Sequence, residues 1–183
     1  EADRGIYDAM NKGIIASNGK YIHILNADDY YADEHVLALV AERLEKFEVV
    51  VGDVSYFDPV ATDVPSRQWV TGDFPSNGFE SGWHPCHPGF FCRRSLYERF
   101  GCFDTKFDVA ADYDLMHRFC KDRESINIMH QFTTWMQNDG HSSVVRNRIR
   151  GNIQCWRAFN SLSDRPLSLV SFMKRRFQFK RNQ

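Results

Sequence analysis

The sequence predicts an α/β fold in which helices flank a mixed sheet. The clearest strand is Tyr21–Leu25, a mostly apolar run that leads directly into the paired acids Asp28 and Asp29. Apolar residues at helical spacing precede and follow it, and a second apolar run covers residues 48–54. A strand, a helix and a strand in this order predict parallel strands joined by a right-handed crossover.

The N-terminal half gives the strongest helix signals. Residues 1–19 carry Ile6, Met10 and Ile14 on one helical face, with Asp3 as a candidate N-cap and Gly19 as the stop. A second helix is expected to open at Asp33 and Glu34 and to run through an apolar stripe that comprises Val36, Leu37, Val40, Leu44 and Phe47.

The remaining elements follow from shorter signals. Residues 55–84 are interrupted by proline and glycine, which predicts hairpins and a long mobile loop. We expect a strand at 89–93, a helix at 95–100 closed by Gly101, and a helix at 112–121. Residues 126–129 and 132–137 are expected to pair with each other as strands, and 142–160 and 166–180 to form two C-terminal helices.

Composition limits the class of protein. The chain has 183 residues and is 43% hydrophobic, which suits one sizeable core. A net charge of −1 gives no indication of a nucleic-acid partner. The five cysteines lack a disulfide framework, so reduced thiols in a cytoplasmic protein are expected. No apolar run approaches the length of a membrane span.

The acids after the first strand are the leading candidate site. Ligands of open α/β sheets gather at the carboxyl ends of strands. Two adjacent carboxylates repel unless a cation lies between them, and Mg²⁺ or Mn²⁺ would supply that charge. An Asp-Asp helix cap or a solvated turn explains Asp28 and Asp29 equally well from this stretch alone.

A further acidic site follows the apolar pair Ala110 and Ala111, which delivers Asp112 to the start of a helix. Asp112 is either a helix cap, the more frequent role there, or a general base that takes the proton of an attacking sugar hydroxyl.

Histidines offer further polar groups. The spacing of His84, Cys86, His87 and Cys92 matches no standard zinc pattern, so His87 is read as a polar group aimed into a cleft or as a satisfied core histidine. The turn at 140–143, which contains His141, could hold an anion on its backbone N–H groups or be an ordinary helix cap.

Three pieces together resemble the family 2 glycosyltransferases of the GT-A fold. They are Asp3–Ile14 (DRGIYDAMNKGI), Leu25–Asp29 (LNADD), and His87 followed by GCFD at 101–104 and ADYDL at 111–115. The resemblance covers roughly residues 1–143 and implies a GT-A-like, Rossmann-like mixed sheet. The family normally begins with a first strand and helix that build much of the nucleotide pocket, so we expect this chain to lack them and to bind nucleotide poorly as it stands.

The resemblance also implies roles for single residues. Asn26–Asp29 would be the DXD-type element, with Asp28 and Asp29 binding Mn²⁺ or Mg²⁺ and with Asn26 and Asp28 near the diphosphate of the donor. Asp112 would be the catalytic base and Asp114 a supporting residue. The other implied donor or acceptor contacts are Asp3, Arg4, Lys12, His87 and His141.

The implied function is transfer of a sugar from a nucleotide diphospho-sugar to a hydroxyl of a saccharide or lipid-linked acceptor, with inversion, in bacterial surface polysaccharide synthesis. The alternative is a non-catalytic remnant or binding module of the same fold. We expect a glycosyltransferase-like domain over 1–160 and a basic helical tail over 161–183. That tail either covers the core or lies peripherally on the inner, anionic face of a membrane. Its apolar stripe comprises Val170, Phe172, Met173 and Phe177, and its basic residues are Lys174, Arg175, Arg176, Lys180 and Arg181.

Overall fold

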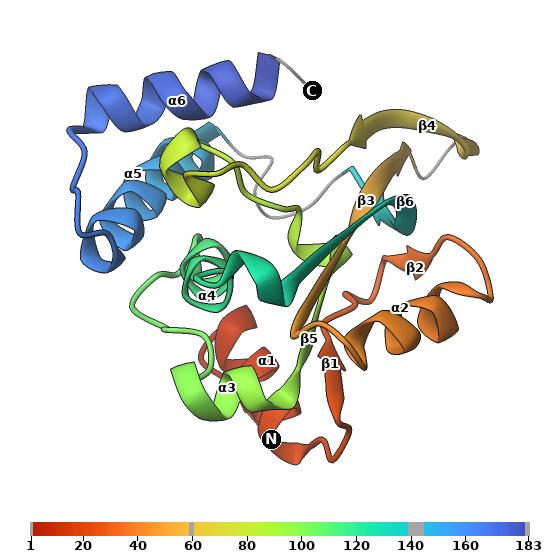
Figure 1. Cartoon of the computed structure of the whole chain (residues 1–183). Helices are drawn as coiled ribbons and strands as arrows, with labels where there is room; N and C mark the ends of the chain where they lie inside the picture. Colours follow the sequence, from red (N-terminus) through yellow and green to blue (C-terminus); the bar gives the residue numbers. More distant parts are fainter. Residues whose placement is uncertain (1, 59–60, 139–144, 182–183) are drawn as a thin grey trace.

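The computed structural model describes residues 2–58, 61–138 and 145–181. Its sheet has the strand order β1-β5-β3-β6-β2, and β4 pairs with the far part of β3 (Figure 1). The strands are β1 (Tyr21–His23), β2 (Tyr30–Tyr31), β3 (Val49–Asp58), β4 (Ala61–Trp69), β5 (Phe90–Arg93) and β6 (Ile126–Gln137).

The sheet is mixed, as predicted, and β3 is its centre. β6 runs parallel to β3, whereas β4 and β5 run antiparallel to it. β1 is antiparallel to β5, so β1 and β3 point the same way, but β5 lies between them. The parallel direction expected for the first two long strands is therefore confirmed, while the strand inserted between them comes from residues far along the chain.

The expected hairpin of 126–129 with 132–137 is wrong. Both segments belong to the single strand β6, which pairs with β3 along Val49–Phe57. The register shifts where Ile128 opposite Val51 gives way to Phe132 opposite Asp53, and His130 has a φ of 49° there. A bulge, not a turn, interrupts the hydrophobic pattern.

Helices cover both faces of the sheet. In Figure 1, α2 lies on one side, whereas α1, α3 and α4 lie on the other, with α5 and α6 stacked beyond α4. The α-helices are α1 (Ile6–Ala16), α2 (Val36–Leu44), α3 (Arg94–Phe100), α4 (Ala111–Phe119), α5 (Val145–Leu162) and α6 (Leu169–Arg181). Short 3₁₀ turns are η1 (Gly78–Ser81), η2 (His87–Gly89) and η3 (Arg123–Ser125).

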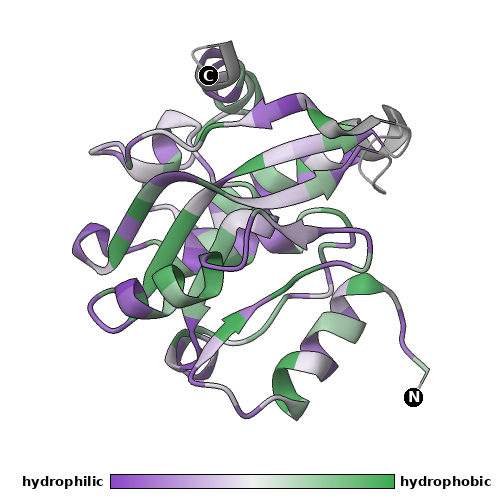
Figure 2. Ribbon diagram, turned by 90° about the vertical axis from the view of Figure 1, so that its right-hand side faces the viewer, coloured by the Kyte–Doolittle hydropathy of each residue, from purple (hydrophilic) through white to green (hydrophobic). Residues whose placement is uncertain are grey.

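Alternation along β3 divides the core into two parts. Val49 and Val51 join the large cluster under α1, α3, α4 and the C-terminal helices, whereas Val50 packs with Val40 and Leu44 of α2. Apolar stretches accordingly follow the central strands in Figure 2. Burial on both faces explains why β3 is a nearly continuous apolar run.

The segment between the β3–β4 hairpin and β5 packs more closely than the expected mobile loop. Phe79 and Trp83 are buried in the large cluster, and Trp83 Nε1 donates to the Thr71 carbonyl at 2.9 Å. The predicted hairpin in this region is confirmed as β3 and β4.

The C-terminal helices belong to the same core. Phe172 of α6 is 1% exposed and lies in the large cluster with Phe159 of α5. Within the described ranges, no helix combines the length and the apolar character needed to cross a membrane. The five cysteines are all free thiols, as expected.

Candidate active site

The acidic turn after β1 is tied together by its own residues. Asp29 N donates to the Asn26 carbonyl at 3.1 Å, and Asn26 Nδ2 donates to Asp29 Oδ2 at 2.8 Å. From β6, Gln137 N donates to Asp29 Oδ1 at 3.3 Å. Burial raises the pKa of Asp29, and the negative charge of the exposed Asp28 raises it further. The turn thus holds one half-buried and one exposed carboxylate side by side.

His87 lies in the η2 turn, which is hydrogen-bonded to the strands β1 and β6. The Pro88 carbonyl accepts a hydrogen bond from His23 Nε2 of β1 at 2.9 Å and another from Thr134 Oγ1 of β6 at 2.7 Å. The position of the η2 turn is therefore set by β1, at one edge of the sheet, and by β6, which lies beside the central strand β3. The His87 ring lies edge-on to Phe103, with ring centroids 5.8 Å apart.

Two carboxylates from distant parts of the chain act on His87. Burial lowers the pKa of His87, while the negative charges of Asp112 and Asp29 oppose that shift. The charges of the acidic turn and of the start of α4 therefore both influence the same imidazole. Neither β1 nor α4 reveals this relationship alone, because it depends on how η2 is held.

Asp112 lies in the first turn of α4 and is half-buried. Its Oδ1 accepts from its neighbour Tyr113 N at 2.8 Å and lies 3.2 Å from the Tyr7 hydroxyl of α1. Among the described residues, no hydrogen bond reaches Oδ2. One oxygen of this carboxylate is thus held by Tyr7 and by the Tyr113 amide, and the other accepts no hydrogen bond from the described part of the chain.

The acidic turn suits a divalent cation that completes its coordination with a ligand. In the described part of the chain, no three His, Cys, Asp or Glu side chains are grouped as a metal site. Mg²⁺ is commonly held by one or two carboxylates together with substrate phosphates and water. Asp28 and Asp29 fit that pattern, since a cation would relieve the repulsion that raises the Asp29 pKa.

The N-terminal candidates gather around one acid on α1. Arg4 N donates to Asp8 Oδ2 at 3.0 Å, and Lys12 Nζ lies 3.4 Å from the same oxygen. Asp3 is exposed and accepts from Gly5 N at 3.0 Å, so Gly5 takes the N-cap position expected for Asp3. Arg4 and Lys12 thus form a basic group balanced by Asp8 at the start of the chain.

Asp114 faces the protein. It is 4% exposed, and Arg118 Nε lies 2.9 Å from its Oδ2. Arg118 also donates to the carbonyls of Phe100, Gly101 and Cys102 and so closes the end of α3. Asp114 supports α4 and α3 through this arginine. His141 and its turn lie outside the described residues.

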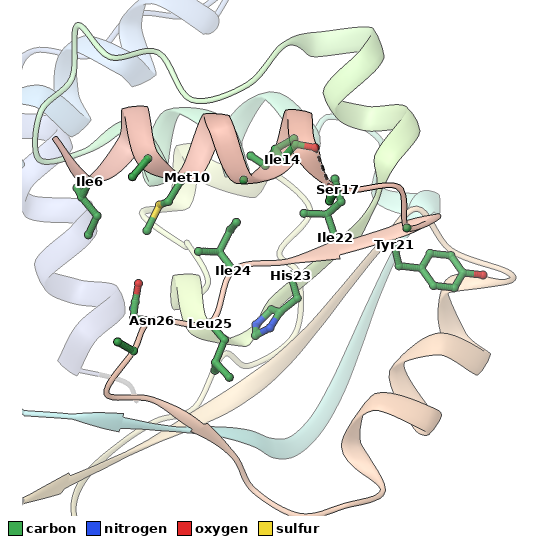
Figure 3. Close-up of a pocket in the computed structure, with 14 residues that line it drawn as sticks. Ile6, Met10, Ile14, Ser17, Tyr21, Ile22, His23, Ile24, Leu25 and Asn26 are labelled. Carbon is green, nitrogen blue, oxygen red and sulfur yellow. Dashed lines mark hydrogen bonds between the residues drawn. The ribbon is translucent and has the colours of Figure 1, made fainter. Parts of the chain in front are cut away.

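A groove of 610 Å³ runs between α1 and β1 and ends at the acidic turn (Figure 3). Ile22 and Ile24 point toward α1, whereas His23 points to the other side of the strand. Met10 and Ile6 line the helical wall, and Asn26 and Ala27 lie among the lining residues of the turn. The groove is mainly apolar and adjoins the candidate metal residues.

Several residues of the site carry no distinctive sequence signal. His23, Thr134 and Gln154 act through single hydrogen bonds to backbone or side-chain groups far away in the sequence. Tyr7 and Asn11 are spaced four residues apart, which places them on one face of α1. That spacing is the only hint that both contact the segment before α4.

Comparisons with known proteins identify the family and the fold of the chain. The model of the family described as "Glycosyl transferase family 2" matches residues 1–101. A "PGL/p-HBAD biosynthesis glycosyltransferase" of Mycobacterium bovis (strain BCG / Pasteur 1173P2) is 32% identical over 114 residues, which is 62% of this chain and 43% of that protein. The equivalent protein of Mycobacterium tuberculosis (strain ATCC 25618 / H37Rv) gives the same values. The chain spans less than half the length of these relatives.

Solved structures give the same fold. S. aureus TarS 1-349 superposes with a TM-score of 0.61 at 13% identity, covering 98% of this chain and 53% of that one. Its complex with UDP-GlcNAc gives a TM-score of 0.62, also at 13% identity, over 99% of this chain and 55% of that one. The mixed sheet and its flanking helices therefore have the GT-A architecture that the motifs predicted. Since the family model covers more than half of the sequence, the chain belongs to glycosyl transferase family 2.

Proposed function

We propose that the site transfers a sugar from a nucleoside diphospho-sugar to an acceptor hydroxyl with inversion at the anomeric carbon. The observation that carries this proposal is a pair of carboxylates held by the fold: Asp29 by Asn26 and Gln137 in the turn after β1, and Asp112 by Tyr7 at the start of α4. One carboxylate belongs to a turn suited to a cation and diphosphate, and the other has an oxygen available to a ligand. A donor and an acceptor would meet between them.

In the proposed reaction, Asp112 accepts the proton of the acceptor hydroxyl as its oxygen attacks the anomeric carbon. The bond from that carbon to the diphosphate oxygen breaks, and the nucleoside diphosphate leaves with the electron pair. Asp28 and Asp29 would hold Mn²⁺ or Mg²⁺, and that charge would stabilise the departing diphosphate. Burial keeps His87 neutral, so its imidazole can donate one hydrogen bond to the donor or acceptor without adding charge.

We take UDP-GlcNAc as the first donor to test, because a structural neighbour is described in complex with it. The acceptor proposed is a saccharide or lipid-linked hydroxyl in bacterial surface polysaccharide synthesis. A related mycobacterial protein is named "PGL/p-HBAD biosynthesis glycosyltransferase", so it too is assigned to a biosynthetic glycosyl transfer.

Peripheral membrane contact is proposed through α6. Its outward residues include Val170 and Phe177, each 65% exposed, with the exposed Lys174 between them. An apolar pair beside a cation suits an anionic bilayer surface. Flotation with phosphatidylglycerol vesicles at low salt tests this proposal: Phe177→Ser combined with Val170→Ser should release the protein, and wild-type protein remaining in the soluble fraction would contradict it.

The decisive experiment for the reaction is binding in the full-length protein. UDP-GlcNAc with Mn²⁺ should raise the thermal midpoint, because a ligand of the native state stabilises by mass action. Asp28→Asn and Asp29→Asn should abolish the metal-dependent part of the shift, whereas Glu98→Gln, an exposed acid on α3, should retain it. The absence of any shift at millimolar UDP-GlcNAc, UDP or GDP would favour a non-catalytic binding module of the same fold.

Product stereochemistry tests the chemical step. NMR of the newly formed glycoside should show the anomeric configuration opposite to that of the donor. Asp112→Asn should retain donor binding and lose transfer, since the amide cannot take the acceptor proton. Transfer at the wild-type rate in Asp112→Asn would exclude Asp112 as the base.

A further inference from the structure

The segment that delivers Asp112 to α4 is held by α1. Asn11 and Phe103 exchange two hydrogen bonds of 2.9 Å, one from the side-chain amide to the carbonyl and one from the backbone N–H to the side-chain oxygen. The Tyr7 ring stacks on Phe103 with centroids 5.4 Å apart. α1 therefore contacts this segment at its beginning, through two side chains one helical turn apart.

The same segment is held from the other side by α5. Gln154 is 7% exposed, and its Oε1 accepts from Val109 N at 3.0 Å. Gln154 Nε2 donates to Asp108 Oδ1 in the same segment. The residues that lead to Asp112 are thus fixed between two helices, which leaves the Asp112 side chain itself as the part that still needs orienting.

Tyr7 makes the contact that orients it. The Tyr7 hydroxyl lies 3.1 Å from the Val109 carbonyl and 3.2 Å from Asp112 Oδ1. Burial raises the pKa of Tyr7, and the negative charge of Asp112 raises it further, so the hydroxyl stays protonated and acts as a donor. Its single proton is shared between two acceptors, one on the segment and one on the carboxylate.

We propose that Tyr7 is a positioning residue for Asp112, an inference that rests on the proposed role of Asp112 as the base. Tyr7 O–H and Tyr113 N–H both bind Oδ1, so the carboxylate is fixed with Oδ2 toward the ligand. A base held in this orientation is already positioned for the acceptor hydroxyl, so rotation of its side chain does not slow the reaction. Tyr7 itself does not touch the reacting atoms.

Tyr7→Phe is the variant that isolates this role, because it removes the hydroxyl and keeps the ring that stacks on Phe103. Tyr97→Phe is the matched control: Tyr97 is a buried tyrosine on α3 whose ring packs against Phe119. The full-length protein is assayed with UDP-GlcNAc and water as the acceptor, by release of UDP. We expect Tyr7→Phe to lower kcat about tenfold with KM for UDP-GlcNAc unchanged, and Tyr97→Phe to leave both at wild-type values.

A purely structural role of Tyr7 predicts a different pattern. In that case the two tyrosine variants would lose similar stability, and neither would lower kcat while leaving KM for UDP-GlcNAc unchanged. Wild-type kcat in Tyr7→Phe, with Asp112→Asn inactive, would overturn the positioning role while leaving the proposed function intact.

A second measurement, which does not depend on turnover, decides the inference when UDP-GlcNAc is not consumed with water as the acceptor. Crystal structures of wild type and Tyr7→Phe compare the orientation of the Asp112 carboxylate. Rotation of the carboxylate in the variant supports the inference, and an unchanged side chain with Oδ1 on the Tyr113 amide overturns it.

Discussion

Gly89 packs directly against the backbone of Gly52, because a β carbon on Gly89 would lie 2.4 Å from the Gly52 carbonyl oxygen. The contact joins η2 to the central strand β3. Gly89 lies two residues after His87, so this close approach also helps to position the His87 ring, which lies edge-on to Phe103.

Gly89→Ala should therefore lower the free energy of unfolding by about 3 kcal/mol, since the Gly52 backbone and a methyl group of Val54 occupy the space that the added methyl group needs. Urea denaturation measures the loss. Gly13→Ala is the matched control, because a β carbon there meets nothing within 4 Å in the middle of α1. That change should stabilise the protein by about 0.5–1 kcal/mol. Equal stability of the two variants would contradict the close approach.

His117 should make the protein sensitive to mild acid. Its ring stacks between Phe79 and Phe159, and burial lowers its pKa to about 4. The unfolded chain takes up a proton below pH of about 6.5, whereas the native state does so only near 4, so stability falls as pH falls between these values. The slope expected for this histidine is about 1.4 kcal/mol per pH unit at most.

His117→Phe should remove this part of the pH dependence. The Nδ1 atom of His117 has no hydrogen-bond partner among the described residues, so a phenyl ring keeps the stack and leaves no polar group unpaired. Denaturant midpoints at pH 7 and pH 5 measure the effect. His35→Gln, at an exposed position before α2, should retain the wild-type dependence. An unchanged slope in His117→Phe would show that other groups cause the acid sensitivity.

Phe172 and Phe177 of α6 should respond to truncation in opposite ways. Phe172 is 1% exposed and Phe177 is 65% exposed. Phe172→Ala should cost about 3–5 kcal/mol through lost burial and a cavity, and Phe177→Ala should change stability by less than about 0.5 kcal/mol. Thermal and urea unfolding of the pair test whether α6 covers the core in solution; similar small losses in both would mean that it does not.

Asp114→Asn tests whether Asp114 supports the fold or binds the donor. The amide weakens the contact to Arg118, whose charge then lies in a poorly compensated site, so stability should fall by about 1–3 kcal/mol. UDP-GlcNAc affinity, measured by calorimetry below the unfolding range, should match wild type. Loss of affinity with stability retained would instead place Asp114 in the donor site.

Helix positions could be predicted from the sequence because their signal is local. The spacing of Ile6, Met10 and Ile14 marks one face of α1, and Ile14 of that set is indeed buried. The two residues Tyr30 and Tyr31 that form β2 had no such pattern, and β1 ends at His23, two residues earlier than its apolar run. Strand ends depend on the neighbouring strand, which a single segment does not specify.

The sequence by itself determined the class of the fold, the acidic turn at Asn26–Asp29 and the acid at the start of α4. These features could be recognised because hydrophobic periodicity and the family motifs depend on residues that are close together in the sequence. Only the tertiary structure decided that β5 lies between β1 and β3, that β6 is one bulged strand, and that the Pro88 carbonyl joins the η2 turn to β1 and β6. It also decided that Tyr7 reaches Asp112, 105 residues further along the chain. Such contacts arise when packing brings distant segments together, and no local period encodes them.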